Sequence, residues 1–407
     1  AALLAAAAAA AAVGCRGLLT SPADAFAGLR QPQPAPRPDR AHLVAMQAAS
    51  SSSKNVPELW KAGPMEVYSG QAQKALYLLK DKPELFESAV DEALEVLDQQ
   101  RFDEEEQRSK MDDKAKEDTL VLRRRMEEVR QNERARIVTE LLYLKVCSKF
   151  KSLQVPLIPP MQGGGDVKFG TLDLKGLTTD IYSKDALDLV RDHLFRIIGQ
   201  QGSTSFMGGM AVVQIALFQA GQVYAMSALF GYYLRRVDAR YQLEKLAGSF
   251  GGWGEEGGEE SNPFSDQDKE GMSSLKDYVS KFGPSEVQRM TTIASMEAQM
   301  AMEQQVTALF GDLRDLKEKL VNALGQVSSN EEATAKLEQA IQAGEVESLR
   351  ITSDDLRRLV LEAVAYGALL NDSEKSVDTV YELTQSGSRP LGALTGDDED
   401  EGRYLTE

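Results

Sequence analysis

Residues 197–234 read IIGQQGSTSFMGGMAVVQIALFQAGQVYAMSALFGYYL and contain no charged side chain. An uncharged run of this length occurs in helices that cross a membrane and in helices buried on all sides of a globular core. Gln214, Gln219 and Gln222 lie within the run, and their amides are costly to place in lipid. We therefore predict a central, buried helix from about Met210 to Leu246, with membrane association as the alternative.

Small side chains on this expected helix would let another helix approach closely. They are Ala216, Ala220 and Ala228. Packing inside the chain's own core is the simpler explanation, because close helix contacts need small residues at the crossing. A homo-oligomer formed through this helix is the alternative.

Helical periodicity continues on both sides of this segment, from Met65 onward, and predicts an all-α fold of long packed helices. Weak alternation at residues 167–171 and 346–352 allows at most a small two-stranded β-ribbon. Capping, proline and glycine residues set the expected helix ends. The expected helices cover residues 71–80, 83–100, 103–150, 183–198, 210–246, 274–324 with a break at Gly283–Pro284, a segment starting behind Ser329–Glu331, and 353–383.

Residues 103–150 are expected to form one long helix or two in series, and their character changes along this length. Residues 103–118 are densely charged, which predicts a solvent-exposed or frayed start. Apolar side chains then recur at helical spacing, from Leu122, Met126 and Val129 onward. This spacing predicts one apolar face along the remainder of the helix.

Changes in composition divide the chain into segments. Residues 1–46 are Ala-rich at the start, hold four Arg, no Lys and two Asp, and include alternating prolines, which is typical of an organelle transit peptide. A secretory signal is the rival interpretation, but the long Pro/Arg stretch fits it poorly. The expected segments are a chloroplast transit peptide (1–46), a flexible leader (47–64), an N-terminal helical region (65–160), a central helical region (161–248), an acidic Gly-rich linker (249–272), a C-terminal helical region (273–385) and a disordered acidic tail (386–407).

The formal net charge of −17 argues against general nucleic-acid binding and against docking on anionic lipid. One basic patch nevertheless occurs within residues 119–151, and helical spacing spreads it around more than half of the helix. A solvated or salt-bridged face is the expected role, and contact with RNA, phosphate or an acidic partner is the alternative. The patch consists of Arg123, Arg124, Arg125, Arg130, Arg134 and Arg136.

Two loop-like patterns are too incomplete to define a ligand site. Residues 252–257 match a glycine spacing used for dinucleotides, but no strand precedes them and two glutamates would repel phosphate. Residues 266–277 match part of a calcium-loop template, with the wrong side-chain lengths at two ligand positions. An acidic linker explains both.

Outside the expected transit peptide, Cys147 and His193 are the only cysteine and histidine. One of each cannot form an internal disulfide or complete a zinc site built from Cys and His. A catalytic pair would require the fold to bring them together, and structural placement is the expected outcome. We therefore expect no cofactor and no metal, and we predict that the protein is not an enzyme.

Several segments carry a family resemblance. Residues 221–225 (GQVYA) and 231–245 (GYYLRRVDARYQLEK) are the most distinctive, and residues 124–150, 289–311 and 356–364 are also similar. In these segments the chain resembles the UV-B-induced chloroplast protein family of plants, an uncharacterised family also described as seed-maturation-like. The resemblance implies a plastid location, supplies no catalytic residues, and suggests turnover as a client of the stromal Clp chaperone–protease.

The predicted function is that of a non-enzymatic interaction or regulatory protein of the chloroplast stroma, linked to UV-B stress by resemblance. Its support is the lack of a chemistry-bearing constellation, together with long amphipathic helices and charged ends. Protein partners are expected. A peripheral protein of the thylakoid or envelope membrane and an RNA- or nucleoid-associated factor are the two alternatives.

Overall fold

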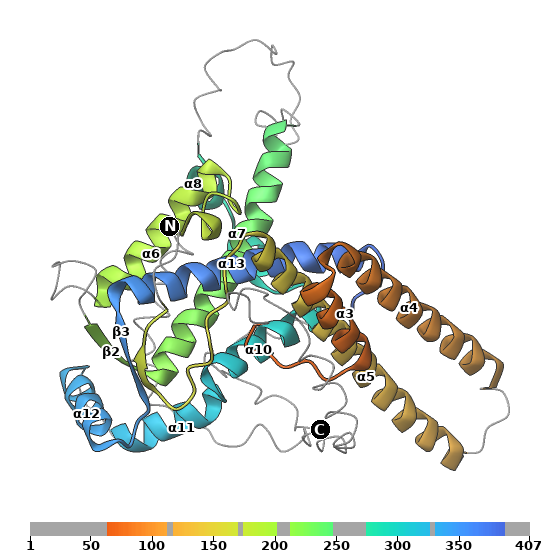
Figure 1. Cartoon of the computed structure of the whole chain (residues 1–407), viewed down its shortest axis with the longest axis horizontal. Coiled ribbons are helices and arrows are strands. Elements are labelled where there is room, and N and C mark those ends of the chain that lie inside the picture. The colour runs from red at the N-terminus through yellow and green to blue at the C-terminus, as the bar shows by residue number, and fades with distance from the viewer. Residues whose placement is uncertain are drawn as a thin grey trace, which may run out of the picture.

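The described part of the chain is mostly helical in this computed structural model (Figure 1). Its strands form one small sheet. The prediction of long packed helices is confirmed. The structure describes residues 63–111, 117–169, 174–201, 212–246, 274–325 and 330–386.

The elements follow one another from the N-terminal helices to the long helix that ends near residue 378. In chain order they are α3 (Gly70–Asp81), η3 (Pro83–Leu85), α4 (Phe86–Met111), α5 (Glu117–Ser152), β1 (Gly165–Val167), η5 (Leu174–Leu177), α6 (Lys184–Gln201), β2 (Val212–Ala216), α7 (Leu217–Leu246), α8 (Leu275–Ser280), α9 (Pro284–Thr291), α10 (Met296–Phe310), α11 (Leu313–Leu324), α12 (Asn330–Ala343), β3 (Ser348–Thr352) and α13 (Ser353–Asp378).

Side-chain caps explain where several helices begin. The hydroxyl groups of Ser69, Ser295 and Thr352 each accept a hydrogen bond from the backbone N–H three residues further on, at the starts of α3, α10 and α13. Ser183, directly before α6, accepts from the N–H of Ala186 at 3.2 Å. These bonds satisfy N–H groups that the first helical turn leaves without a partner.

Two long helices, α7 and α13, cross at the centre of the body (Figure 1). A Cβ atom added to Gly231 would lie 1.9 Å from the carbonyl oxygen of Val364, and one added to Gly367 would lie 1.8 Å from that of Ala228. Neither helix has room for a side chain at this point, so the crossing requires glycine on both. Ala228 therefore packs within its own chain.

Further helices pack around this crossing and complete the core. α5 and α10 contact each other, and both contact the central pair; α6 packs against α13, and α11 packs against α7. Phe150, Tyr224 and Tyr366 are fully buried among these helices. The Tyr366 hydroxyl donates to the carbonyl of Ala301 on α10 at 3.2 Å, so this buried polar group keeps a partner.

The described parts of the uncharged run belong to three elements, which corrects the predicted start of the central helix. Residues 197–201 end α6. Residues 212–216 form β2, and α7 begins at Leu217 instead of near Met210. The change has a local cause, because β-branched Val212, Val213 and Ile215 favour a strand and pair with β3. Among the described residues, no helix has the length and apolar character needed to cross a bilayer.

The sheet has three strands in the order β1–β3–β2, whereas a two-stranded ribbon was predicted. β3 lies within the predicted segment 346–352, but β1 overlaps the predicted segment 167–171 only at Val167. β1 and β3 pair in parallel, with Asp166 opposite Arg350. The third strand, β2, runs antiparallel to β3, with Ile215 opposite Leu349. These two apolar side chains are buried, which attaches the sheet to the helical core.

Other predicted helix ends are also wrong, including that of the last helix, which ends at Asp378 and not near residue 383. α4 continues through the expected end near residue 100 as far as Met111. The helix expected over residues 274–324 is divided into four, because the chain is extended at the Ser295 cap and Gly311 adopts a φ of 91°, in addition to the predicted break at Gly283–Pro284. These errors all concern ends, which periodicity alone locates poorly.

Candidate functional site

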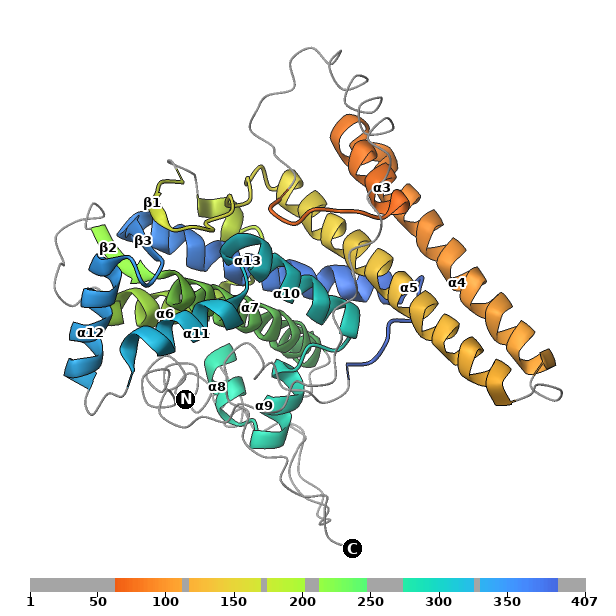
Figure 2. The same ribbon diagram turned by 90° about the horizontal axis from the view of Figure 1, so that it is seen from below.

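The C-terminal part of α4 and the N-terminal part of α5 lie side by side and project from the body (Figure 2). We call residues 98–111 and 117–136 the arm. Among the side chains that the structure describes in these two helices, the last buried one of α4 is Leu97 and the first of α5 is Val138. Every side chain from residue 122 to residue 133 is exposed. The α5 part of the arm is roughly 30 Å long at 1.5 Å per residue.

Buried polar contacts fix the base of the arm to the body. The ammonium group of Lys145, on α5, lies 3.1 Å from both Glu87 and Asp91 on α4, and its side chain is only 4% exposed. The Glu140 carboxylate accepts hydrogen bonds from the N–H and hydroxyl groups of Ser69, which caps α3. The base is therefore held in place while the outer turns project into solvent.

Three arginines of the basic patch hold the arm together. Glu104 of α4 lies 2.5 Å from Arg134 and 3.4 Å from Arg130 on α5. Arg136 lies 3.3 Å from Glu140 and covers the ring of Tyr68 at 5.4 Å. The Glu104 contacts join α4 to α5, and the Tyr68 contact joins α5 to the segment before α3, so a structural role accounts for this half of the patch.

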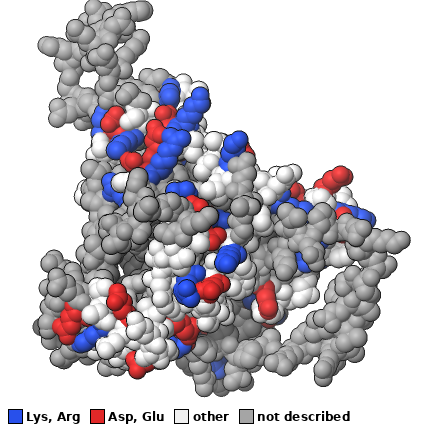
Figure 3. All heavy atoms as spheres, turned by 60° about the vertical axis from the view of Figure 1, so that its left-hand side comes forward, with Lys and Arg blue, Asp and Glu red and all other residues white. Residues whose placement is uncertain are grey.

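The other three arginines, Arg123, Arg124 and Arg125, lie further out and are all exposed. Arg124 approaches Glu128 at 3.9 Å, one helical turn away. The six arginines therefore do not form one continuous basic surface. On the side of the body away from the arm, acidic and basic side chains are intermixed (Figure 3).

An apolar stripe is the most unusual feature of the arm. Leu122, Met126 and Val129 are 61%, 47% and 57% exposed, although their spacing places them on one face of α5. Exposed apolar side chains that cluster on one surface mark interaction sites, whereas scattered ones are ordinary. The stripe can therefore bind an apolar surface of another molecule.

The same face of α5 is covered nearer the body. Glu140 follows Val129 by three helical turns on this face, and Tyr68 and Ser69 cover it there. The sequence analysis treated Leu122, Met126 and Val129 as part of one apolar face and missed their exposure. The dense charge on both sides of them, from Arg123 to Glu128, was the signal available.

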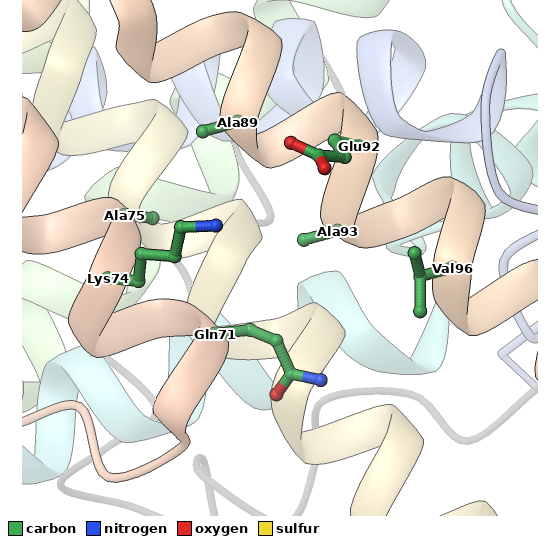
Figure 4. Close-up of a pocket in the computed structure, with 7 residues that line it drawn as sticks. All are labelled: Gln71, Lys74, Ala75, Ala89, Glu92, Ala93 and Val96. Carbon is green, nitrogen blue, oxygen red and sulfur yellow. The ribbon is translucent and has the colours of Figure 1, made fainter.

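A shallow groove lies between α3 and α4 (Figure 4). Lys74 and Glu92 lie on opposite walls, and Ala89, Ala93 and Val96 line the α4 side. Its volume is about 150 Å³. Small-molecule sites usually span roughly 300–1,000 Å³, so the groove is a surface feature too small for a cofactor.

A buried carboxyl group lies within the helical core. Glu362, on α13, accepts hydrogen bonds from the N–H of Ile158 at 3.0 and 3.1 Å. Burial raises its pKa to about 8, with the Ile158 N–H and the Arg358 guanidinium acting in the opposite direction. Arg358 donates to the carbonyls of Phe169 and Pro156, so the two residues tie α13 to the neighbouring loop.

Cys147 and His193 have separate surroundings. Burial raises the pKa of the Cys147 thiol to about 12, which leaves it protonated and unreactive at neutral pH. His193 stacks on Phe230 with ring centroids 4.2 Å apart, and its Nε2 lies 3.1 Å from the Ser227 hydroxyl. Burial lowers the pKa of His193 to about 4. Both side chains are packed in the core and do not lie together.

Two sequence patterns lie wholly or largely outside the described residues. These are the glycine pattern at 252–257 and most of the calcium-loop pattern at 266–277. The last position of the calcium-loop pattern, Asp277, lies in α8. The Asp277 carboxylate accepts a hydrogen bond from the Ser274 hydroxyl at 2.8 Å. In the described stretches, no cluster of three or more His, Cys, Asp or Glu side chains is arranged to hold a metal ion.

Comparison with known proteins gives a family but no mechanism. The chain is 29% identical over 376 aligned residues to a protein of Arabidopsis thaliana named "UV-B-induced protein, chloroplastic", covering 84% of this chain and 82% of that protein. No solved structure matches the chain. The model of the family "Protein of unknown function (DUF760)" matches residues 121–247 and 274–386, which include most of α5 and the whole α7–α13 crossing. On this match the chain belongs to the DUF760 family.

Proposed function

We propose that this protein is a chloroplast protein, located in the stroma, that acts by binding other proteins through its arm and not by catalysis. The name of the Arabidopsis relative supports the chloroplast and the link to UV-B stress. The Ala-, Pro- and Arg-rich composition of residues 1–46 supports the same location independently.

The single observation that carries a binding role is the exposed stripe of Leu122, Met126 and Val129 on a projecting arm. Three large apolar residues at this spacing are the usual anchors when a helix binds an apolar surface. The arm needs none of them for its own attachment, since Lys145 and Glu140 fix its base. Binding to a partner would explain why these exposed positions carry apolar side chains.

Co-purification from chloroplast extract tests the proposal. We compare the tagged wild-type chain with the triple variant Leu122→Ser/Met126→Ser/Val129→Ser. Proteins bound through the arm should fall at least about tenfold in the triple variant, because buried apolar anchors dominate interface energies.

The matched control is Phe102→Ser. Phe102 is 65% exposed on the same arm, but it lies two residues before Glu104 and therefore faces away from α5. This control should retain the bound proteins. Equal retention by the wild-type chain and the triple variant would refute a binding role for the stripe.

A reporter experiment tests the location separately. Residues 1–62 fused to a fluorescent protein should direct it into the stroma of plant cells. Fluorescence confined to the cytosol, or to the envelope or thylakoid membranes, would contradict the proposed location.

A further inference from the structure

The exposed stripe has the spacing of a coiled-coil seam. Leu122, Met126 and Val129 follow one another at intervals of four and three residues, which separate the apolar a and d positions of a heptad. In heptad letters they occupy d, a and d. Their side chains lie on one face of α5, in the part of the arm that projects from the body (Figure 2). Another helix with apolar side chains at matching intervals can therefore lie along α5.

This seam has a basic edge on each side. Arg123 and Arg130 occupy e positions, Arg125 occupies a g position, and the other g position holds a glutamine. The e and g positions flank an a/d seam and set partner choice through ion pairs between helices. Glu127 and Glu128 occupy b and c, on the far side of the helix. The seam therefore presents positive charge to a partner, although the whole chain has a net charge of −17.

Two of these arginines are available to another molecule. Arg123 and Arg125 are exposed, and among the described residues neither has a carboxylate within ion-pair distance. Arg130 differs, because it lies 3.4 Å from Glu104 of α4. Carboxylates that a partner brings to both edges of the seam would thus meet Arg123 on one edge and Arg125 on the other.

The apolar seam is short. Toward the body, Glu133 and Arg136 take the next a and d positions, and Arg136 lies over the Tyr68 ring at 5.4 Å. The seam is therefore limited to residues 122–129, about 10 Å of helix, which fits a transient partner better than a permanent subunit. A second copy of α5 would set arginine against arginine along these edges, in either direction, so like charge disfavours that occupant.

We propose that the stripe binds a helix of another protein that has apolar residues at its own a and d positions and Glu or Asp at the flanking e and g positions. Its carboxylates pair with Arg123 and Arg125, and its apolar side chains bury Leu122, Met126 and Val129. The same arginines repel helices with basic flanks, so the arm selects its partners by the sign of their charge. This inference rests on the proposed function and names the chemical class of the partner.

Two labelled peptides of about four heptads test this selectivity. They share the same apolar a and d residues but carry either Glu or Lys at every e and g position, and fluorescence anisotropy measures their binding to the full chain. The wild-type chain should bind the Glu peptide at least about tenfold more tightly than the Lys peptide. Arg123→Glu/Arg125→Glu should reverse this preference, because it changes the sign of the charge on both edges of the seam.

Arg124→Glu is the matched control. Arg124 is adjacent to both reversed positions but lies on the side of α5 opposite the stripe, so this variant should keep the preference for the Glu peptide. Leu122→Ser/Met126→Ser/Val129→Ser should bind neither peptide, and circular dichroism should show that all variants are folded.

Three results would overturn the acidic partner. They are equal binding of both peptides by the wild-type chain, an unchanged preference after Arg123→Glu/Arg125→Glu, and binding of neither peptide at about 1 mM, where even weak complexes form. Capture of chloroplast proteins that still depends on the stripe would then leave the proposed function standing. Loss of that capture as well would refute both.

Discussion

The α7–α13 crossing and the arm use apolar periodicity in opposite ways. At the crossing, Gly231 and Gly367 bring two backbones so close that no Cβ fits between them. Along the arm, Leu122 and Val129 have the spacing of a core-facing stripe, yet both are more than half exposed. Periodicity therefore identifies a contact face without showing whether the contact lies inside the chain. The surrounding charge makes that distinction, because α7 begins uncharged and the stripe lies among arginines and glutamates.

The largest effect is expected at the crossing. Gly367→Ala places a Cβ 1.8 Å from the backbone oxygen of Ala228, which no change of rotamer can relieve. The variant should lose at least about 3 kcal/mol of unfolding free energy, at the upper end for overpacked cores, or fail to fold. Urea denaturation followed by circular dichroism measures this loss.

Gly70→Ala is the matched control for that substitution. Gly70 is the first residue of α3, and an added Cβ there would meet no atom within 4 Å. Alanine favours helix more than glycine does, so this control should be neutral or slightly stabilising. Similar losses in both variants would show that the crossing is looser than described.

A pH-dependent effect of intermediate size is expected from Glu362 beneath the crossing. Its pKa is raised from the ordinary 4.5 to about 8, so the folded chain keeps a proton that the unfolded chain has released. Stability should therefore fall as pH rises from about 4.5 to 8, by up to about 1.4 kcal/mol per pH unit. Below about pH 4.5, the stabilisation that the protonated Glu362 gives to the folded chain is fully present.

Glu362→Gln should remove this slope, because glutamine cannot ionise and still offers an oxygen to the Ile158 N–H. Its stability relative to wild type should improve between pH 5 and pH 8, as measured by thermal unfolding at each pH. Glu95→Gln, at an exposed position on α4, serves as the control for loss of a carboxylate. Parallel stability curves for the wild type and Glu362→Gln would show that the group ionises normally.

The helical fold and the buried central helix could both be predicted from the sequence. The central helix could be predicted because an uncharged run that contains amide side chains is stable mainly inside a protein core. It did not separate β2 from α7, since a strand of five residues depends on its pairing with β3, more than 130 residues away. The arm was missed for the same kind of reason. Whether Met126 is covered depends on where α3 begins and how far α4 extends, and neither is encoded near Met126.

The smallest effect is expected within the arm itself. Glu104→Gln removes the carboxylate that joins Arg130 and Arg134 to α4. Both pairs lie at the surface, the one with Arg134 partly buried, and surface pairs contribute up to about 1 kcal/mol, so global stability should barely change. Opening of the arm should become up to about fivefold more frequent, seen as faster amide hydrogen exchange at residues 98–107 and 122–134. Glu95→Gln, half a turn around α4 from Glu104, should leave exchange unchanged. Faster exchange in the core helices as well would mean that the arm and the crossing open together, and the two regions would then be one cooperative unit.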